Sequence, residues 1–375
     1  MKIKNVQATA LKIPVNFEDL GVDHKSFNNV THVKVETDNG LLGYGLTSIT
    51  QSRPVAEVIN SVLGPAIIGM DPTLHERVWD RLYWTATPWG QSGYASHAIS
   101  AIDLALWDIK GRQQNLPVWR LLGGAHTNIP IYATCGFSFM SNSEVIEVVG
   151  RVIEKGFTGV KLQVGRPGLD YKGKSPSLNQ LIKDDIKRVR DIREAVGPSI
   201  EIAVDAACRL DYVSALKLCE GLEELNISFF EEPIAQNDVN LLAKLRQKTS
   251  IPLSAGQNEG LSYRFRDFLV SQAVDVIQPN VIITGGVTQC LRIAGMASAF
   301  NVLISNGGGA PLHNGHFQAG VTNGTAVEYQ YNAVAACDVL YGVKPVHENG
   351  CMVLGEAPGF GLQPKEEVIK YAADL

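Results

Sequence analysis

Two adjacent carboxylates, Glu231 and Glu232, end the apolar segment ISFFEEP at residues 227–233. A short apolar run that stops at acid and proline is typical of a buried strand that reaches a polar rim. Neighbouring side chains on a strand point to opposite faces, so the two glutamates cannot both face one cavity. Because a buried carboxylate is costly unless a cation or hydrogen bonds compensate it, the segment predicts either a metal site or a salt-bridge network.

The elements that must position these acids show a regular rhythm after residue 125. Short apolar segments alternate with amphipathic helical stretches, which predicts a parallel sheet. Eight such units over about 200 residues favour a closed TIM-type barrel over an open doubly wound sheet. No segment is followed by a GxGxxG phosphate loop, which argues against a dinucleotide-binding fold. The eight predicted strands begin near residues 129, 159, 200, 227, 251, 274, 301 and 325.

The strand ends of such a barrel carry its functional side chains. Asp205, Glu231 and Gln257 end three successive predicted strands. Their oxygens could converge on a hard cation such as Mg²⁺, or each could form a separate salt bridge at the rim. The other candidates at strand ends, or just after them, are Lys161, Gln163, Asn280, His313, His316 and Glu328.

Residues 1–125 form a different, α+β region. THVKVET and LLGYGLT flank an Asn-Gly turn, which predicts an antiparallel hairpin. The polar segment at residues 16–29 is predicted to be an irregular lid or binding loop, in which His24 and Lys25 either bind substrate or are simply solvated. The Gly/Pro-rich tail is expected to return to this region. The predicted domains are therefore 1–125 with 346–375, and 126–345.

A helix at residues 94–113 is apolar on most faces, which implies packing on several sides. It contains Asp103 and Asp108. At a spacing of five residues they do not share one helix face, so capping or ion pairing suits them better than joint catalysis.

The overall composition excludes several classes of function. The formal charge of −5 and the absence of a Lys/Arg cluster argue against nucleic-acid binding. No apolar run reaches membrane-spanning length, and the N-terminus lacks a signal-peptide core, so we expect a cytoplasmic protein without membrane contact. The six scattered cysteines form no CxxC pair and are expected to be reduced.

Several motifs, in this order and spacing, resemble the enolase superfamily, and within it the mandelate racemase/muconate lactonizing enzyme-like family, mandelate racemase-type subgroup. They are AISAIDLALWDIKG, VKLQVG, VDA, FFEEP, PLSAGQNEG, DVIQPNVIITGG and EAPGFG, and they extend over essentially the whole chain. The resemblance implies a (β/α)7β barrel with an α+β capping domain built from both termini. It also implies one Mg²⁺ per subunit, a small-molecule carboxylate substrate and a homo-oligomer.

The resemblance further implies a reaction, abstraction of the proton α to a carboxylate through a metal-stabilised enediolate. A dication and a lysine near the enediolate oxygens supply the electrostatic stabilisation that this charge needs. By similarity, Asp205 and Glu231 are the first two metal ligands. Lys161 corresponds to the lysine that neutralises the substrate carboxylate, and Glu328 to the acid that hydrogen-bonds it.

Three positions depart from the family pattern. The usual Lys-x-Lys is Lys161-Leu162-Gln163 here, and glutamine cannot accept a proton. The third ligand, usually Glu, is Gln257, so the site loses one negative charge and is expected to bind Mg²⁺ more weakly. Glu259 could replace Gln257 as the ligand, and Glu232 is expected to lie behind the ligands.

The third departure removes the His–Asp dyad, whose Asp position is Asn280 and whose His position falls in residues 305–309. His313 and His316 follow this glycine-rich turn and are candidate bases, because histidine titrates near neutral pH. Alternatively, they cap the next helix or face solvent. Lys161 is a further candidate if Mg²⁺ lowers its pKa. Gln163 and Asn280 are then expected to bind substrate.

The favoured function is Mg²⁺-dependent dehydration of a hydroxy acid or sugar acid to a 2-keto acid. A racemase or epimerase of a 2-hydroxy acid or amino acid derivative is the first alternative, because Lys161 and a histidine would lie on opposite faces of the α-carbon. A binding protein that keeps the barrel but has lost the chemistry is the second, since both standard bases and one anionic ligand are replaced.

Overall fold

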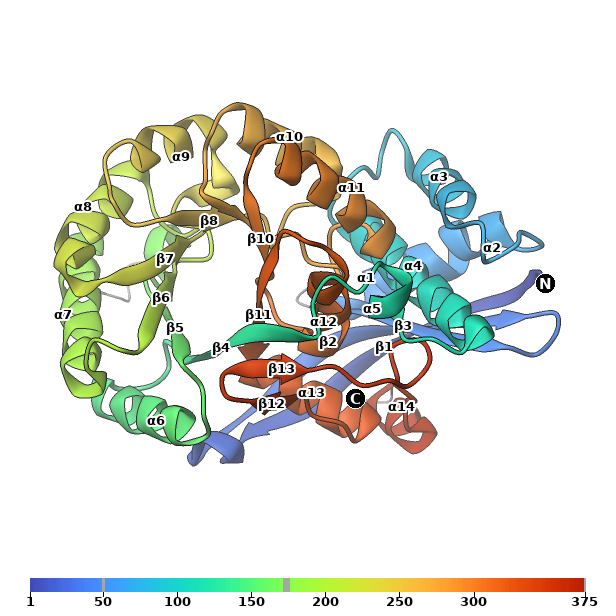
Figure 1. The fold of residues 1–375 in the computed structure, drawn as a ribbon, viewed down its shortest axis with the longest axis horizontal. Helices are drawn as coiled ribbons and strands as arrows, with labels where there is room; N and C mark the ends of the chain where they lie inside the picture. Colours follow the sequence, from blue (N-terminus) through green and yellow to red (C-terminus); the bar gives the residue numbers. More distant parts are fainter. Residues whose placement is uncertain (49–50, 171–175, 374–375) are drawn as a thin grey trace.

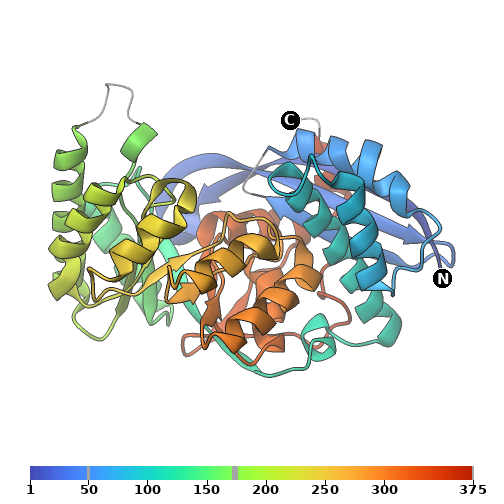
Figure 2. The ribbon, with the colours of Figure 1, turned by 90° about the horizontal axis from the view of Figure 1, so that it is seen from above.

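The computed structural model describes residues 1–48, 51–170 and 176–373. Figure 1 shows a ring of strands inside a ring of helices, with long N-terminal strands and further helices beside it. Figure 2 shows these N-terminal helices on one side of the molecule, next to the barrel helix of residues 286–299. The capped-barrel architecture predicted from the sequence is confirmed.

The cap contains an antiparallel sheet in the order β1 (Ile3–Phe17), β2 (Val22–Thr37) and β3 (Leu42–Ser48). Its helices are α1 (Ser52–Val58), a π-helical turn (Ile59–Leu63), α2 (Gly64–Ile67), α3 (His75–Ala86) and α4 (Tyr94–Gln114). Helix α4 lies directly on β3, because glycines there admit the helix backbone. A Cβ on Gly45 would lie 2.1 Å from the Ala101 carbonyl oxygen.

The prediction of an irregular loop at residues 16–29 is wrong. Strands β1 and β2 continue through it as a ribbon, with Ile13 opposite Asn28 and Asn16 opposite Lys25. A short 3-10 turn (Glu18–Leu20) closes the ribbon. Side chains of residues 22–29 are alternately half-buried and exposed, so polar residues suit this strand and resemble a loop in the sequence.

Eight strands of the described chain form the barrel, and β11 pairs with β4 to close it. They are β4 (Asn128–Gly136), β5 (Gly159–Gln163), β6 (Glu201–Asp205), β7 (Ile227–Glu231), β8 (Leu253–Ala255), β9 (Val276–Ile277), β10 (Leu303–Ser305) and β11 (Gly324–Gln330). All neighbouring pairs among them are parallel.

The barrel helices follow the strands in turn. They are α6 (Asn142–Glu154), α7 (Leu178–Val196), α8 (Tyr212–Leu222), α9 (Val239–Arg246), α10 (Leu261–Val270), α11 (Gly286–Ala299), α12 (Pro311–Gly320) and α13 (Tyr331–Tyr341). The short α5 (Val118–Leu121) links the cap to β4, and further 3-10 turns span Gly168–Asp170, Glu223–Leu225 and Ala235–Asn237.

The C-terminal tail contacts both parts of the molecule. Strands β12 (Val346–Glu348) and β13 (Cys351–Val353) form a hairpin, and β13 pairs antiparallel with the barrel strand β4. Helix α14 (Glu366–Ala373) then packs against β1 of the cap. No helix in the described ranges is long and apolar enough to cross a membrane.

Buried hydrogen bonds fix the cap on the barrel. Asp103 in α4 accepts from the Thr288 backbone N–H at 3.0 Å and from its hydroxyl at 2.6 Å, which caps α11. Asp108 accepts from the backbone N–H groups of Tyr44 and Phe360, both at 3.0 Å, and from Arg112 at 2.7 Å. The prediction of capping and ion pairing for these two aspartates is confirmed.

Candidate active site

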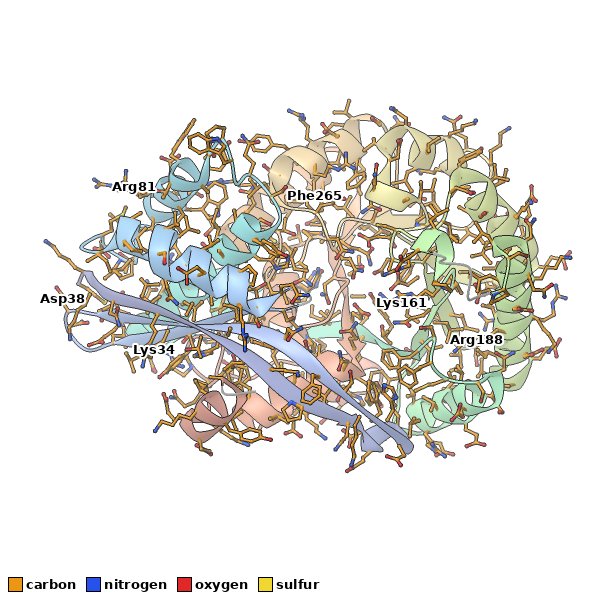
Figure 3. The ribbon with its side chains drawn as sticks, turned by 180° about the vertical axis from the view of Figure 1, so that it is seen from behind. Lys34, Asp38, Arg81, Lys161, Arg188 and Phe265 are labelled. Atoms are coloured by element: carbon orange, nitrogen blue, oxygen red, sulfur yellow. The ribbon has the colours of Figure 1, made fainter. Side chains whose placement is uncertain are left out.

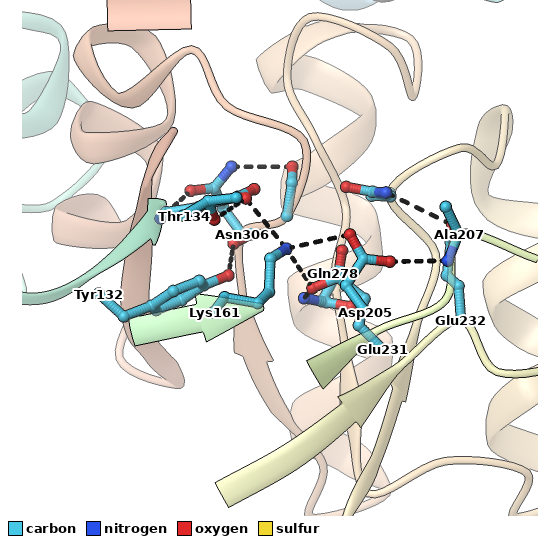
Figure 4. A network of polar contacts seen from close by, with 12 residues as sticks. Tyr132, Thr134, Lys161, Asp205, Ala207, Glu231, Glu232, Gln278 and Asn306 are labelled. Carbon is cyan, nitrogen blue, oxygen red and sulfur yellow. Dashed lines mark hydrogen bonds and ion pairs between the residues drawn. The ribbon is translucent and has the colours of Figure 1, made fainter. Parts of the chain in front are cut away.

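Lys161 lies inside the barrel, 1% exposed, where β5 ends among three carboxylates (Figure 3). Its Nζ is 2.7 Å from Glu231 Oε2, 3.0 Å from Glu328 Oε1 and 3.8 Å from Asp205 Oδ2. These acids come from the ends of β7 and β6 and from β11. Figure 4 shows the ammonium between them. We call these four residues the Lys161 cluster.

The cluster holds more negative charge than its lysine neutralises. Burial lowers the pKa of Lys161, but attraction by Glu231, Glu328 and the other nearby acids outweighs burial and raises it well above its usual value. Burial raises the pKa of Glu231 to about 8, against the attraction of Lys161. An additional cation beside the carboxylates would relieve their mutual repulsion.

Several buried oxygens near the cluster lack hydrogen-bond partners in the part of the chain that the structure describes. Two of them, Glu231 Oε1 and Gln257 Oε1, also face the same space. Each lies 3.0 Å from the point that a Cβ on Gly307 would occupy, so the absent side chain leaves a space that both oxygens face. Asp205 stands next to Glu231 in the barrel register and accepts the Ala207 N–H at 2.7 Å through Oδ1.

This donor set fits Mg²⁺, which prefers carboxylate and amide oxygens. The described residues contain no group of three His, Cys, Asp or Glu side chains arranged for a metal. A site here therefore requires the Gln257 amide together with Asp205 and Glu231. Glu259 does not face the space at Gly307, because its carboxylate is held by Asn237 at 2.9 Å and by Arg264 at 3.2 Å.

Glu232 points away from the cluster, as the alternation of β7 predicts. It is fully buried and accepts from Asn237 at 3.0 Å and from Asn258 at 2.6 Å. The Gln257 amide N–H donates to the same carboxylate at 3.4 Å. Glu232 therefore orients the Gln257 amide with its oxygen toward Gly307.

His313 and His316 lie elsewhere. Both are in α12 and pack against Phe360 of the tail, with ring centroids 4.9 and 5.2 Å away. His316 Nδ1 accepts the Trp119 backbone N–H at 3.1 Å, and burial lowers the pKa of each histidine to about 3. Across the described ranges, neither ring has a polar contact with the Lys161 cluster. This placement does not support the expected role as base.

Asn280 supports the glycine turn and does not face a substrate. Its Nδ2 donates to the Gly307 carbonyl at 2.8 Å, and its Oδ1 accepts from Asn314 at 2.9 Å. Gln163 lies at the end of β5, where its Oε1 accepts the Ser138 N–H at 2.9 Å. The expectation that Asn280 binds substrate therefore has no geometric support, whereas Gln163 remains at the mouth.

His24 and Lys25 are in the β2 part of the ribbon. The His24 ring stacks on Phe139 with centroids 3.8 Å apart. Lys25 lines an outer groove of about 520 Å³ between the ribbon and α13, which contains no residue of the Lys161 cluster. Of the two residues, His24 packs on the segment that follows β4, through Phe139.

Three residues of the site were missed from the sequence. Gln278 donates to Glu231 Oε2 at 2.8 Å, the Thr134 hydroxyl donates to Glu328 Oε1, and the Tyr132 hydroxyl donates to the Asn306 carbonyl at 2.8 Å. Strand alternation could have found two of them, because Tyr132 and Thr134 share the inner face of β4, where Thr134 pairs with Lys161.

Comparisons with known proteins agree with this geometry. Residues 5–123 match the N-terminal domain of the mandelate racemase / muconate lactonizing enzyme family, and residues 144–368 match the enolase C-terminal domain-like family. The chain belongs to this family of the enolase superfamily.

Its relatives include acid-sugar dehydratases and racemases. The chain is 29% identical to an arabinonate dehydratase of Saccharolobus solfataricus over 91% of its length and 90% of the relative. It is 31% identical to a D-galactonate dehydratase of Verminephrobacter eiseniae over 73% of its length and 70% of the relative. The crystal structure of a racemase from Streptomyces coelicolor with bound magnesium superposes with a TM-score of 0.88, at 25% identity and 99% coverage of both chains.

Proposed function

We propose that this chain is a Mg²⁺-dependent hydro-lyase that dehydrates a hydroxy acid, most simply a sugar acid, to a 2-keto acid. The observation that carries the proposal is the pair of unpartnered oxygens, Glu231 Oε1 and Gln257 Oε1, that face the space at Gly307 beside the Lys161 cluster. Buried oxygens without donors are expensive to keep unless a ligand completes them.

The residues that would hold the metal are Asp205, Glu231 and Gln257. When bound, Mg²⁺ supplies positive charge that stabilises the substrate carboxylate as negative charge builds on it. The Lys161 ammonium attracts the same carboxylate, and Glu231 and Glu328 keep Nζ at the mouth of the barrel. The Thr134 hydroxyl holds one oxygen of Glu328, which orients that acid. These groups are in place before substrate arrives, as electrostatic preorganisation requires.

Lys161 is also the candidate base, because, unlike His313 and His316, it contacts the carboxylates at the strand ends. A cation held by Asp205 and Glu231 would offset the attraction that raises the pKa of Lys161, and in its neutral form Nζ takes the proton from the α-carbon and becomes an ammonium. The carbon–carbon double bond then forms as the β-hydroxyl leaves, and the ammonium gives its proton to that hydroxyl, so water is released. The enol product takes a solvent proton at C3 and becomes the 2-keto acid.

The placement of the histidines supports dehydration over racemisation. A racemase needs a base on each face of the α-carbon, whereas one base that returns its proton to the leaving hydroxyl suffices for dehydration. His313 and His316 pack on Phe360 and do not supply the second base. The dehydratase relatives are consistent with this proposal.

The proposal is tested with a panel of sugar acids and hydroxy acids in D₂O with Mg²⁺. A dehydratase yields a 2-keto acid with deuterium at C3, and omission of Mg²⁺ abolishes the product. Return of α-deuterated substrate would show a racemase or epimerase instead. No product, no exchange and no Mg²⁺ binding at millimolar concentration would show a binding protein.

Variants assign the role of the lysine. Lys161→Met is expected to lower kcat/KM at least about 10³-fold, because it removes both the charge at the carboxylate and the base. Lys183→Met, on the exposed surface of α7, is the matched control and is expected to keep full activity. Turnover by Lys161→Met near the wild-type rate would contradict the assignment.

A further inference from the structure

A second polar site lies next to the Lys161 cluster. It is a cavity of about 290 Å³ lined by Gln163 at the end of β5, by Arg166 just after it, and by the inner side of α7, which contributes Arg188. Figure 3 shows Arg188 on the same side of the barrel as Lys161, toward the outer helices. The reaction proposed above uses neither arginine.

Both arginines have hydrogen-bond donors to spare. Arg166 Nε and Arg188 Nε are buried and have no partner among the residues that the structure describes. Arg188 is only 8% exposed, and its Nη2 donates to the Phe137 carbonyl at 2.9 Å. A guanidinium offers five N–H donors in a fixed plane, and a buried donor without an acceptor is unfavourable. The Nε–H groups of both arginines therefore lack a hydrogen-bond acceptor, which a bound ligand could supply.

Charged side chains of both signs line the cavity. Arg166, Lys187 and Arg188 lie there with Asp184 and Asp185, and Lys187 is paired with Asp191. Asp185 accepts the Gly165 N–H at 2.7 Å, and Asp184 accepts from Gln180 at 2.8 Å. Asp185 also attracts Arg188, which helps to hold the guanidinium at the cavity. The case for an anion therefore rests on the unpartnered N–H groups of the two arginines.

Arg166 belongs both to the cavity lining and to the surroundings of the proposed metal site. Arg166 Nη2 is 3.5 Å from Asp205 Oδ2, so the guanidinium reaches from the Lys161 cluster to the cavity. Gln163 pairs with Asp205 in the barrel register and lines the cavity as well. Gln163 and Arg166 therefore connect the proposed metal site with the cavity along the end of β5.

We propose that Arg166 and Arg188 bind a second anionic group at the far end of the substrate. The substrate is then an acid with two anionic ends, a dicarboxylic or a phosphorylated sugar acid, and not a simple monocarboxylic one. Arginine binds carboxylate and phosphate through paired, charge-assisted N–H donors, which supplies both affinity and orientation. The inference rests on the proposed function, because that function places the first carboxylate at Lys161.

The test is a binding measurement that needs no turnover. Glutarate, 4-phosphonobutyrate and pentanoate share one chain length and differ only at the far end, and none has a β-hydroxyl group to eliminate. Calorimetric titration in the presence of Mg²⁺ is expected to show glutarate or the phosphonate binding about tenfold or more tightly than pentanoate. Tighter binding of glutarate would indicate a carboxylate at the far end of the substrate, and tighter binding of 4-phosphonobutyrate would indicate a phosphate.

Matched variants locate the effect. Arg188→Gln and Arg166→Gln are each expected to remove the preference for two anionic ends, while Arg190→Gln, on the exposed face of the same α7 helix, is expected to keep it. Because Arg188 also holds the Phe137 carbonyl, the Arg166 variant tests the proposal if Arg188→Gln fails to fold. Equal binding of glutarate, 4-phosphonobutyrate and pentanoate, or a preference that survives both substitutions, would overturn it. Failure of dehydration alone would leave these titrations unaffected.

Discussion

Two sets of buried side-chain oxygens in this protein differ in how completely they are hydrogen-bonded. At the contact between cap and barrel, both oxygens of Asp103 and both of Asp108 accept from nearby donors. At the mouth of the barrel, Glu231 Oε1 and Gln257 Oε1 have no donor in the described chain. Both sets are buried to a similar degree, since Asp103 is 1% exposed and Glu231 is 0% exposed.

A raised pKa does not separate the two sets. Burial raises the pKa of Asp103 to about 7 and that of Glu231 to about 8. What separates them is the unpartnered oxygens and the crowding of three carboxylates around Lys161. At the mouth, two unpartnered oxygens that face one space beside crowded carboxylates point to a ligand, whereas the fully partnered Asp103 and Asp108 hold the cap on the barrel.

The largest effect is expected at the mouth. Glu231→Gln removes the negative charge of a proposed metal ligand and is expected to lower kcat/KM at least about 10³-fold. In metal-free protein the same change is expected not to lower the melting temperature, because it removes one of the crowded charges. Turnover and thermal unfolding of this variant are compared with those of Glu220→Gln on the exposed surface of α8. A strong loss of stability would place Glu231 with the structural carboxylates.

The opposite pattern is expected at the domain contact. Asp108→Ala leaves the Tyr44 and Phe360 N–H groups and Arg112 without their acceptor, and should lower the free energy of unfolding by about 3 kcal/mol. Urea unfolding measures the loss. Activity per folded molecule is expected to stay close to wild type when Mg²⁺ saturates, and a large fall in kcat would contradict the structural role.

The buried histidines of α12 pack on Phe360 away from the Lys161 cluster, although His313 Nδ1 has no partner in the described chain, and pH tests their structural role. His313 and His316 have pKa values of about 3 when folded, against an ordinary 6.5. Below pH 6.5 the unfolded chain binds protons that the folded protein does not, so stability is complete above 6.5 and falls as the pH drops. Between pH 6.5 and pH 5 the loss is about 2 kcal/mol per histidine.

Urea unfolding at pH 7 and pH 5 measures how far the free energy of unfolding falls. His313→Asn is expected to reduce this fall by the contribution of one histidine. The same variant is expected to keep kcat/KM within about threefold of wild type at pH 7, because a residue packed on Phe360 does not touch substrate. Loss of one limb of the pH–rate profile in His313→Asn would show that His313 acts as a base.

The smallest effect is expected from Gln257→Glu. This change restores a negative charge to the proposed metal site and should lower the Mg²⁺ Kd about tenfold, as measured by calorimetry. Gln247→Glu, the same substitution at an exposed position that ends α9, is the control. If Gln257→Glu left the affinity unchanged, the amide would not belong to the metal site.

The positions of strand ends could be predicted from the sequence. Apolar runs that stop at Asp205, Glu231 and Gln257 mark the ends of three barrel strands, and parallel strands in a closed barrel bring those ends together. The alternation of a strand also predicts that Glu231 and Glu232 face opposite sides, as they do.

The orientation of residues after a turn could not be predicted in this way. Pro311 begins a helix immediately after the glycine turn, and this helix directs His313 and His316 toward Phe360, which comes from the distant tail. The ribbon at residues 16–29 resembles a loop in the sequence because its aromatic partners, Phe137 and Phe139, also lie far along the chain. Contacts between distant segments decide both cases.

Strand β4 has consequences for how the chain folds. Apart from β5, its partners are β11 and β13, which lie near the C-terminal end. During synthesis, one edge of β4 must therefore remain unpaired until almost the whole barrel has been made. Such late, long-range pairing slows folding and exposes a strand edge to other chains. The nascent protein is thus expected to depend on chaperones until its last strands emerge from the ribosome.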